Sequence, residues 1–233
     1  MSGSFGGQGV MSVLKSFVDT YETADGRTIQ SLSVSEREAY EKDPYHGARD
    51  PRMNVSIFTP ADNTGFSNYT FNPFNPDCGD YIGRNDGIRS GYMMKKFMTE
   101  DDRGNNGNGS LDFVIYRYAE VLLDYVECLI ETGHWNDPKV KEYIDAIRVR
   151  GGMPRMDETV YNSEEKVREL YRRERRVELC FEGKRYDDIR RWGIGNDVMN
   201  GPIYGAWNPD TQAFIKLEER RCTFPKFDSW PIP

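Results

Sequence analysis

The stretch that decides the fold is residues 171–192, with the sequence YRRERRVELCFEGKRYDDIRRW. It holds eight basic and five acidic side chains in twenty-two residues, and it still keeps apolar residues at helical spacing. Together with the residues before it, one helical face is formed by Val167, Leu170, Val177 and Phe181. Gly183 interrupts this pattern, and a second short helical turn leads to Trp192. The stretch therefore predicts two consecutive helical pieces.

Two acidic residues, Glu174 and Glu178, fall on or beside the apolar face of this helix. A buried carboxylate requires a fixed cationic partner, so the pattern predicts a structural ion-pair lattice in which nearby acids balance the arginines of the stretch. The alternative makes Glu174 and Glu178 the acid/base pair of a glycoside hydrolase. Cationic surroundings disfavour it, because a general acid needs a pocket that raises the pKa of its carboxyl group.

Composition limits the classes of function. Only 37% of the 233 residues are hydrophobic and the mean hydropathy is -0.75, while 22 glycines and 12 prolines predict long irregular connections around a helical centre. The net charge of -7 argues against nucleic acid as a partner. No apolar run is long enough to cross a bilayer, and MSGSFGGQGV at residues 1–10 lacks the features of a signal peptide.

The sequence offers no metal or cofactor motif. The four cysteines stand singly, without a CxxC pair, and there are only two histidines, so we expect no zinc site and no cofactor. The polar stretch EDDRGNNGNGS at residues 100–110 contains possible calcium ligands, but it does not fit the EF-hand pattern. We interpret it as a solvated loop.

The first hundred residues predict little regular structure. Apolar spacing predicts a helix over residues 10–21, and residues 35–40 could form one further helical turn. Alternation over residues 49–60 predicts a short strand, and residues 91–96 could form a second one.

Residues 61–91 are rich in aromatic side chains set among Asn, Gly, Pro and Asp, and they contain almost no aliphatic ones. Aromatic faces beside amide and carboxylate groups suit sugars, because C–H patches pack on rings while hydroxyls form hydrogen bonds. The alternative is that these rings fill the space beneath a loop that has too few aliphatic residues. With a second aromatic segment near the C-terminus, the candidate ligand-binding residues are Phe66, Tyr69, Phe74, Tyr81 and Trp207. The sequence indicates no catalytic residue.

A helical hairpin follows. Apolar spacing predicts one helix over residues 111–130, ended by Gly133, and a second helix that begins at Asp137-Pro138 and ends at Gly151. Such a hairpin of tetratricopeptide type buries its faces only by stacking on neighbours, so we expect one face to lie exposed. A third helix, capped by Asn162 or Ser163, runs into the opening stretch, and the chain after Trp192 is expected to be irregular. The predicted fold class is mainly α: the hairpin plus further helices, long irregular loops and minor short strands.

Several motifs occur in the order found in one known family. RYAEVLLDYVECLIETG, IDAIRVRGGMP, RRERRVELCFEGKRYDDIRRW and the final WPIP resemble the SusD/RagB family, as do YETADGR and ARDPRM nearer the N-terminus. The resemblance covers most of residues 10–192 and the last four residues. The consensus residues found here, including Glu174, Glu178, Arg185, Asp188 and Arg190, are scaffold residues of that family and not its ligand site.

The resemblance implies an outer-membrane, surface-exposed lipoprotein that captures glycans, or peptides in the RagB branch, for a TonB-dependent transporter of the SusC type. It implies a tetratricopeptide-like scaffold. It also implies that residues 1–233 are the C-terminal domain of a longer protein, whose N-terminal half would carry a signal peptide, a lipidated cysteine and further helical repeats.

We therefore expect a non-catalytic glycan-binding protein with no cofactor, whose membrane attachment lies outside these residues. Two alternatives belong to other classes. One is the glycoside hydrolase that uses Glu174 and Glu178, and the other is a helical-repeat adaptor that binds protein through the hairpin at residues 111–150.

Overall fold

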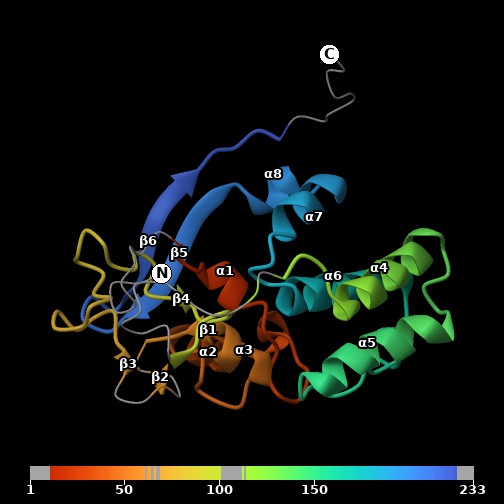
Figure 1. Cartoon of the computed structure of the whole chain (residues 1–233), viewed down its shortest axis with the longest axis horizontal. Coiled ribbons are helices and arrows are strands. Elements are labelled where there is room, and N and C mark those ends of the chain that lie inside the picture. Colours follow the sequence, from red (N-terminus) through yellow and green to blue (C-terminus); the bar gives the residue numbers. More distant parts are fainter. Residues whose placement is uncertain are drawn as a thin grey trace.

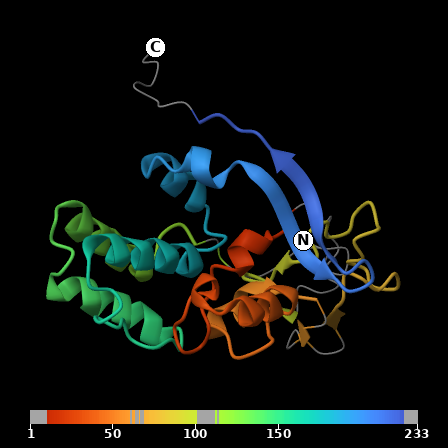
Figure 2. The same ribbon diagram turned by 180° about the vertical axis from the view of Figure 1, so that it is seen from behind.

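The computed structural model describes residues 11–60, 62, 63, 66, 69–100, 112 and 114–224. Along its longest axis, α4 to α6 form one end, α1 to α3 lie in the middle, and β5 and β6 form a long curved hairpin at the other end (Figures 1 and 2). The helices are α1 (Lys15–Val18), α2 (Val34–Lys42), α3 (Pro51–Ser56), α4 (Tyr118–Glu131), α5 (Pro138–Arg150), α6 (Glu164–Glu178), α7 (Arg185–Arg191) and α8 (Gly195–Val198), with the 3-10 turn η2 (Ile29–Ser31). The strands are β1 (Ile57–Phe58), β2 (Asp62–Asn63), β3 (Thr70–Phe71), β4 (Met93–Met94), β5 (Gly201–Asn208) and β6 (Ala213–Arg220).

The predicted mainly α fold is confirmed, and one hydrophobic core lies where the hairpin of α4 and α5 packs on α6. The second helix begins as the sequence predicts, because Asp137 accepts a hydrogen bond from the Lys139 amide and Pro138 occupies the first helical position. Ser163 caps α6 by accepting from the Lys166 amide. The buried core between the three helices consists of Leu122, Leu123, Val126, Ile130, Val140, Ile144, Ile147, Met156, Val167, Leu170, Tyr171 and Leu179.

Three sequence predictions about elements are wrong. The helix predicted over residues 10–21 is reduced to α1, and the strand predicted over residues 49–60 is mostly α3. There, Asp50 accepts a hydrogen bond from the Arg52 amide and Pro51 takes the first helical position, so helix capping overrides the alternating pattern. The chain after Trp192 is not irregular, because residues 201–220 form the β5–β6 hairpin.

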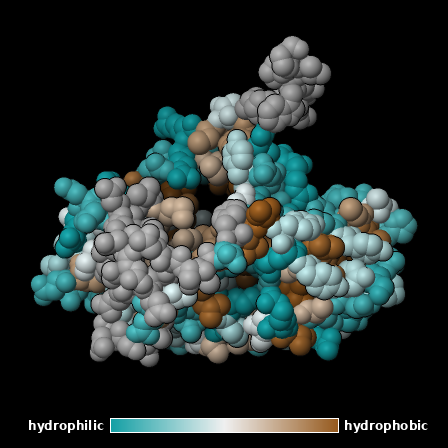
Figure 3. Space-filling view, in the orientation of Figure 1, coloured by the Kyte–Doolittle hydropathy of each residue, from teal (hydrophilic) through white to brown (hydrophobic). Residues whose placement is uncertain are grey.

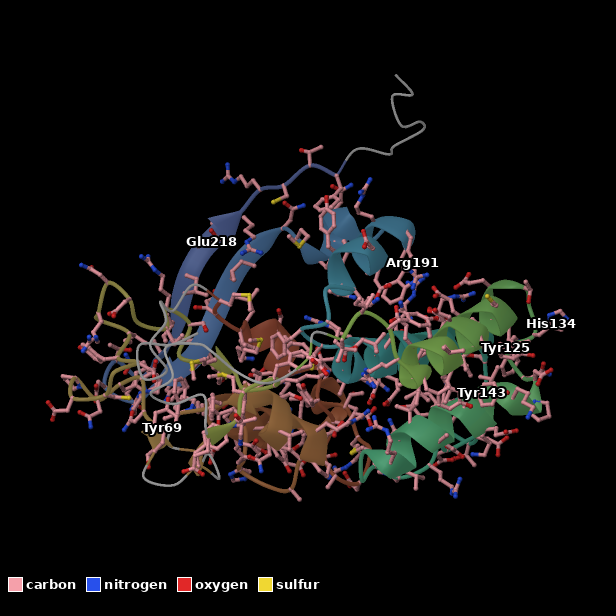
Figure 4. All side chains as sticks on the ribbon, in the orientation of Figure 1. Tyr69, Tyr125, His134, Tyr143, Arg191 and Glu218 are labelled. Atoms are coloured by element: carbon pink, nitrogen blue, oxygen red, sulfur yellow. The ribbon has the colours of Figure 1, made fainter. Side chains whose placement is uncertain are left out.

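One face of the helical hairpin is exposed, as predicted, within the part of the chain that the structure describes. Tyr118 is 74% exposed and Tyr125 is 50% exposed, and Val121 lies between them on α4. Apolar atoms interrupt the polar surface at this end of the molecule (Figure 3). Tyr125 and Tyr143 meet edge to face across α4 and α5, with ring centroids 5.5 Å apart, far from Tyr69 at the opposite end (Figure 4).

The ion-pair lattice predicted around Glu174 and Glu178 is present. Both glutamate side chains are only 2% exposed. Glu174 accepts from Arg52 of α3 and from Arg148 of α5, the latter at 3.2 Å. Arg148 also donates to Glu22 at 2.9 Å. The lattice therefore joins the hairpin, α6 and the N-terminal segments.

The partners of Glu178 come from equally distant parts of the chain. Arg117, just before α4, donates to it at 2.6 Å, Arg52 approaches within 3.3 Å, and Arg150 of α5 also pairs with it. The expectation that acids within the stretch balance its arginines is therefore only partly correct. Arg175 and Arg191 do pair with Asp188, at 3.0 and 2.8 Å. The buried glutamates, however, use arginines from outside the stretch, which leaves other arginines of the stretch without these partners.

Candidate functional site

A cavity of about 690 Å³ lies at the end of the molecule that is opposite the helical hairpin. Its walls come from the end of α2, the loop after β3, the segment before β4 and the end of β5 (Figure 1). The residues that give it chemical character are Lys42, Asp43, Tyr45, Asn72, Phe74, Asn75, Tyr92, Trp207 and Asp210. The cavity thus combines aromatic rings with amides, carboxylates and one ammonium group.

Trp207 forms one wall from the end of β5. It faces Phe214 across the hairpin, where the ring centroids are 5.1 Å apart at an interplanar angle of 75°. The Lys42 Nζ atom lies 5.1 Å from the Trp207 ring centroid, within the range of a cation–π contact. Trp207 itself is only half-buried. Its ring therefore contacts both Phe214 and Lys42 while part of its surface remains exposed to solvent.

The facing wall is a loop that local hydrogen bonds hold in shape. The Asn72 side chain accepts a hydrogen bond from the Phe74 amide at 3.2 Å, and the Asn75 side chain accepts one from the Asp77 amide at 3.0 Å. These are Asx turns, which fix a loop without a helix or strand. The Ile82 amide also donates to the Pro73 carbonyl at 2.9 Å. Phe74 is consequently presented at a fixed position on the cavity wall.

A buried arginine positions the wall at the end of α2. Arg49 donates to the carbonyl oxygen of Pro44 at 3.1 Å, and other N–H groups of the same guanidinium donate to Val18, Tyr21 and Glu22 carbonyls. One planar donor thereby ties the α2 end to the segment after α1. Burial lowers the pKa of Arg49 from its ordinary value, and the group still remains charged at neutral pH.

The floor depends on a close approach between β5 and the segment before β4. The Ala206 amide donates to the Ser90 carbonyl at 2.7 Å. A Cβ atom at Gly205 would lie 2.2 Å from that carbonyl oxygen, so only glycine fits there. Gly91 adopts a positive φ of 72°, which an L side chain rarely takes. Next to it, burial first, then the charge of Asp19, raises the pKa of Tyr92, so its hydroxyl group stays protonated.

Replacing Gly205 by alanine should therefore open the contact between β5 and Ser90. We expect a loss of about 1 to 3 kcal/mol in the free energy of unfolding, because the new methyl group meets backbone that cannot rotate away. Urea unfolding measures the change. Thr211→Ala, at an exposed position of the same hairpin turn, is the control and should change stability by less than about 0.5 kcal/mol. Equal stability of the two variants would contradict the close approach.

The structure brings two of the five candidate ligand residues together. Phe74 and Trp207 line the same cavity. Phe66 and Tyr69 instead pack on Phe58 beneath their loop, and the Tyr69 hydroxyl group donates to buried Asp80 at 2.6 Å. Tyr81 packs over Gly83 outside the cavity lining. Phe66 and Tyr69 thus fill the space beneath the loop, as the alternative interpretation expects, whereas Phe74 lines a cavity.

Sequence reasoning missed the rest of the lining. Tyr45 and Lys42 lie near the Asp43-Pro44 stop of α2, and Asn72 and Asn75 occupy the same polar loop as Phe74. The one available signal is composition, since three rings and two amides occur within residues 69–75. Nothing local to the sequence connects the α2 end with the β5 end.

The residues Glu174 and Glu178 are not among those that line this cavity. Burial acts to raise the pKa of Glu178, but the hydrogen bond from Arg117 and the charges of Arg117, Arg150 and Arg52 outweigh it and lower the pKa. A general acid requires the opposite shift, so that it holds a proton near neutral pH.

Two further features of the described residues concern metal binding and membrane insertion. Within the described residues, no group of three or more His, Cys, Asp or Glu side chains is arranged to hold a metal ion. None of the helices in that part of the chain combines the length and apolarity needed to cross a membrane. The calcium-ligand candidates at residues 101–110 lie outside the described residues.

Comparison with known proteins identifies the fold and its family. The sequence profile of the SusD family matches residues 2–233. The chain belongs to the SusD family. SusD-like protein P2 of Formosa agariphila is 28% identical over 189 residues, which are 78% of this chain and 35% of that relative. SusD-like protein P25 of the same organism is 31% identical over 122 residues, which are 52% of this chain and 23% of that relative.

Solved structures of SusD-like proteins share this fold. A SusD-like carbohydrate binding protein from Bacteroides fragilis superposes with a TM-score of 0.75 at 30% identity, over 94% of this chain and 45% of that one. A second SusD-like protein from Bacteroides fragilis gives a TM-score of 0.71 at 27% identity, over 92% of this chain and 42% of that one. The chain thus spans less than half the length of these SusD-like relatives.

Proposed function

We propose that the cavity beside Trp207 binds glycans and that the protein acts without catalysis. The observation that carries the proposal is the meeting of Trp207 and Phe74, from segments far apart in sequence, in one cavity that also holds Asn72, Asn75 and Asp210. Rings provide surfaces on which sugar C–H patches pack, and the amides and carboxylates provide partners for hydroxyl groups. One SusD-like relative of known structure is described as a carbohydrate binding protein, which supports the same class of ligand.

The expected binding is modest for each sugar unit. The cavity is open and its polar groups, among them Asp43 and Asp210, are exposed to water. Each hydrogen bond exchanged with water contributes on the order of 1 kcal/mol. The stacked rings therefore provide most of the affinity, and a polysaccharide chain would bind more tightly than a monosaccharide.

Trp207→Ala should weaken glycan binding by at least about tenfold, equivalent to about 1.4 kcal/mol, because it removes the larger ring surface of the cavity. Phe74→Ala should weaken binding less, because its ring is smaller. Affinity gel electrophoresis against a panel of soluble polysaccharides, followed by calorimetry on the one that binds, measures the effect. Tyr118→Ala removes an exposed ring at the other end of the molecule and is the matched control.

The panel also separates the alternatives. Heat with peptides and none with glycans would replace the glycan proposal by peptide capture of the RagB type. Release of reducing ends that stops in Glu174→Gln would replace binding by hydrolysis. Equal retardation of wild type and Trp207→Ala would place the glycan site elsewhere.

Membership of the SusD family supports a wider proposal for the complete protein. We propose that residues 1–233 are one domain of a longer lipoprotein, anchored at the outer membrane and exposed at the cell surface. It would deliver its glycan to a TonB-dependent transporter of the SusC type. Co-purification of such a transporter with the tagged full-length protein from outer membranes tests this proposal, and recovery without any transporter would count against it.

A further inference from the structure

A second cavity, of about 480 Å³, lies between α1 and the junction of α6 and α7. Figure 2 shows α1 beside the C-terminal end of α6, where the chain turns toward α7. The cavity shares no lining residue with the one beside Trp207. Its apolar walls are formed mainly by Val13, Leu14, Phe17, Leu179, Phe181 and Tyr186. The cavity could therefore hold the apolar part of a ligand, and it is separate from the proposed glycan site.

Four cationic side chains line this cavity, and two of them are paired. Arg175 donates to Asp124 at 2.7 Å and to Asp188 at 3.0 Å, and Lys184 pairs with Glu120 at 3.0 Å. Arg176 and Arg185 form no ion pair or hydrogen bond with any residue that the structure describes. The cavity is thus lined by two cations whose N–H groups have no protein acceptor in the described chain.

Both free guanidinium groups lie within cation–π range of an aromatic ring. The Arg176 Cζ atom lies 5.5 Å from the Phe17 ring centroid, and the Arg185 Cζ atom lies 5.9 Å from that of Trp192. A cation–π contact uses no N–H group as a hydrogen-bond donor, and the N–H groups of a guanidinium can bind a carboxylate in a bidentate way. These contacts therefore leave the donors of both arginines available to an anion.

The described side chains that line the cavity carry more positive than negative charge, so the cavity can accept an anion. Among the described residues that line the cavity, only Asp188 carries a carboxylate; it already accepts from Arg175 and Arg191, and its charge also acts on Arg185. Burial, followed by the charge of Arg185, lowers the pKa of Arg176 to about 10, so the group remains protonated at neutral pH. Unbalanced cations in a half-buried site favour an incoming anion.

From this geometry we propose that the cavity between α1, α6 and α7 binds an organic carboxylate with an apolar body, its charge held by Arg176 and Arg185. The apolar walls receive the aromatic or aliphatic part. Two sources share this chemistry, a free carboxylic acid and the C-terminus of a peptide. The site is independent of glycan binding, so either proposal can fail without the other.

Calorimetry and thermal shift with 4-phenylbutyrate and with N-acetylphenylalanine test the site. Each probe should bind the whole chain, and the corresponding amides should bind at least about tenfold more weakly, because hydrogen bonds to charged groups contribute about 1.5 to 3 kcal/mol. The acid that binds more tightly shows whether the site prefers a free carboxylic acid or the C-terminus of a peptide. Acids and amides that bind equally, or acids that do not bind at all, would overturn the proposal without the need for any variant.

The variants Arg176→Gln and Arg185→Gln should each reduce the affinity for the acids by at least about tenfold and leave the amides unchanged. Because neither side chain forms an ion pair or hydrogen bond with a described residue, the melting temperature should change little. Arg89→Gln, at an exposed position away from this cavity, is the control and should bind like wild type. Full affinity in both cavity variants would show that the acids bind elsewhere.

Discussion

Replacing Glu174 by alanine should lower the free energy of unfolding by about 3 to 5 kcal/mol, because it removes one carboxylate from a buried network of ion pairs and leaves its arginine partners in place. Glu174 is 2% exposed and pairs with Arg52 and Arg148, whose side chains are 11% and 3% exposed. Without the carboxylate, the two guanidinium groups lose the acceptor that compensates for their burial. Urea unfolding followed by circular dichroism at pH 7 measures the loss.

A matched ion pair on the surface provides the control. Glu142 pairs with Lys139 at 2.8 Å, and both side chains are about half exposed, at 56% and 47%. Glu142→Ala should therefore cost less than about 1 kcal/mol. Glycan affinity of the folded Glu174→Ala protein should equal that of wild type. Loss of binding without loss of stability would mean that Glu174 belongs to the ligand site and not to the scaffold.

The stability of the protein should fall as the pH decreases below about 4.5, the ordinary pKa of a glutamate. The pKa values of Glu127, Glu178 and Glu182 are all lowered in the folded protein, since hydrogen bonds from arginines and neighbouring cations outweigh the effect of burial. A carboxyl group whose folded pKa is depressed stabilises the protein above its unfolded pKa. That contribution disappears as the pH falls through the folded value.

One group acts in the opposite direction. Burial, opposed by Lys15, raises the pKa of Asp19, so this carboxyl group favours the folded state slightly as it becomes protonated. Carboxyl groups with a lowered pKa outnumber Asp19 among the described residues, so we expect stability to rise with pH over this range. Melting temperatures between pH 7 and pH 3 test the sign. Glu178→Gln should be less stable at pH 7 and less sensitive to acid, and a wild-type melting temperature that stays constant to pH 3 would contradict the lattice as its cause.

Much of the helical scaffold could be predicted from the sequence. The helices α5 and α6 begin where Asp137-Pro138 and Ser163 place their capping groups, because a cap acts within one turn of the chain. Apolar spacing predicts the start of α4 at residue 111, but the helix begins at Tyr118, because the spacing continues into the residues that precede it. At α3, a short capped helix and an alternating strand compete over six residues, which periodicity alone cannot separate.

The candidate site was predictable only in part. The polar, aromatic composition of the loop pointed to Phe74 as well as to Phe66 and Tyr69, and no local feature distinguishes the ring that lines a cavity from the two that fill the loop core. The sequence predicts Trp207 as a ligand residue in an irregular segment, whereas the structure places it on β5. Its neighbours Lys42 and Tyr45 come from the end of α2, which only the folded chain brings near β5.

The sequence by itself determined that Glu174 and Glu178 lie on a buried helical face and need cationic partners, because both spacing and desolvation act locally. Only the tertiary structure decided which arginines form ion pairs with these two glutamates. Arg52 reaches Glu174 across 122 residues of sequence, and the arginines nearest in sequence are left to other contacts. The physical reason is that a charge requirement is a property of a residue and its helix, whereas the partner is set by how distant segments pack.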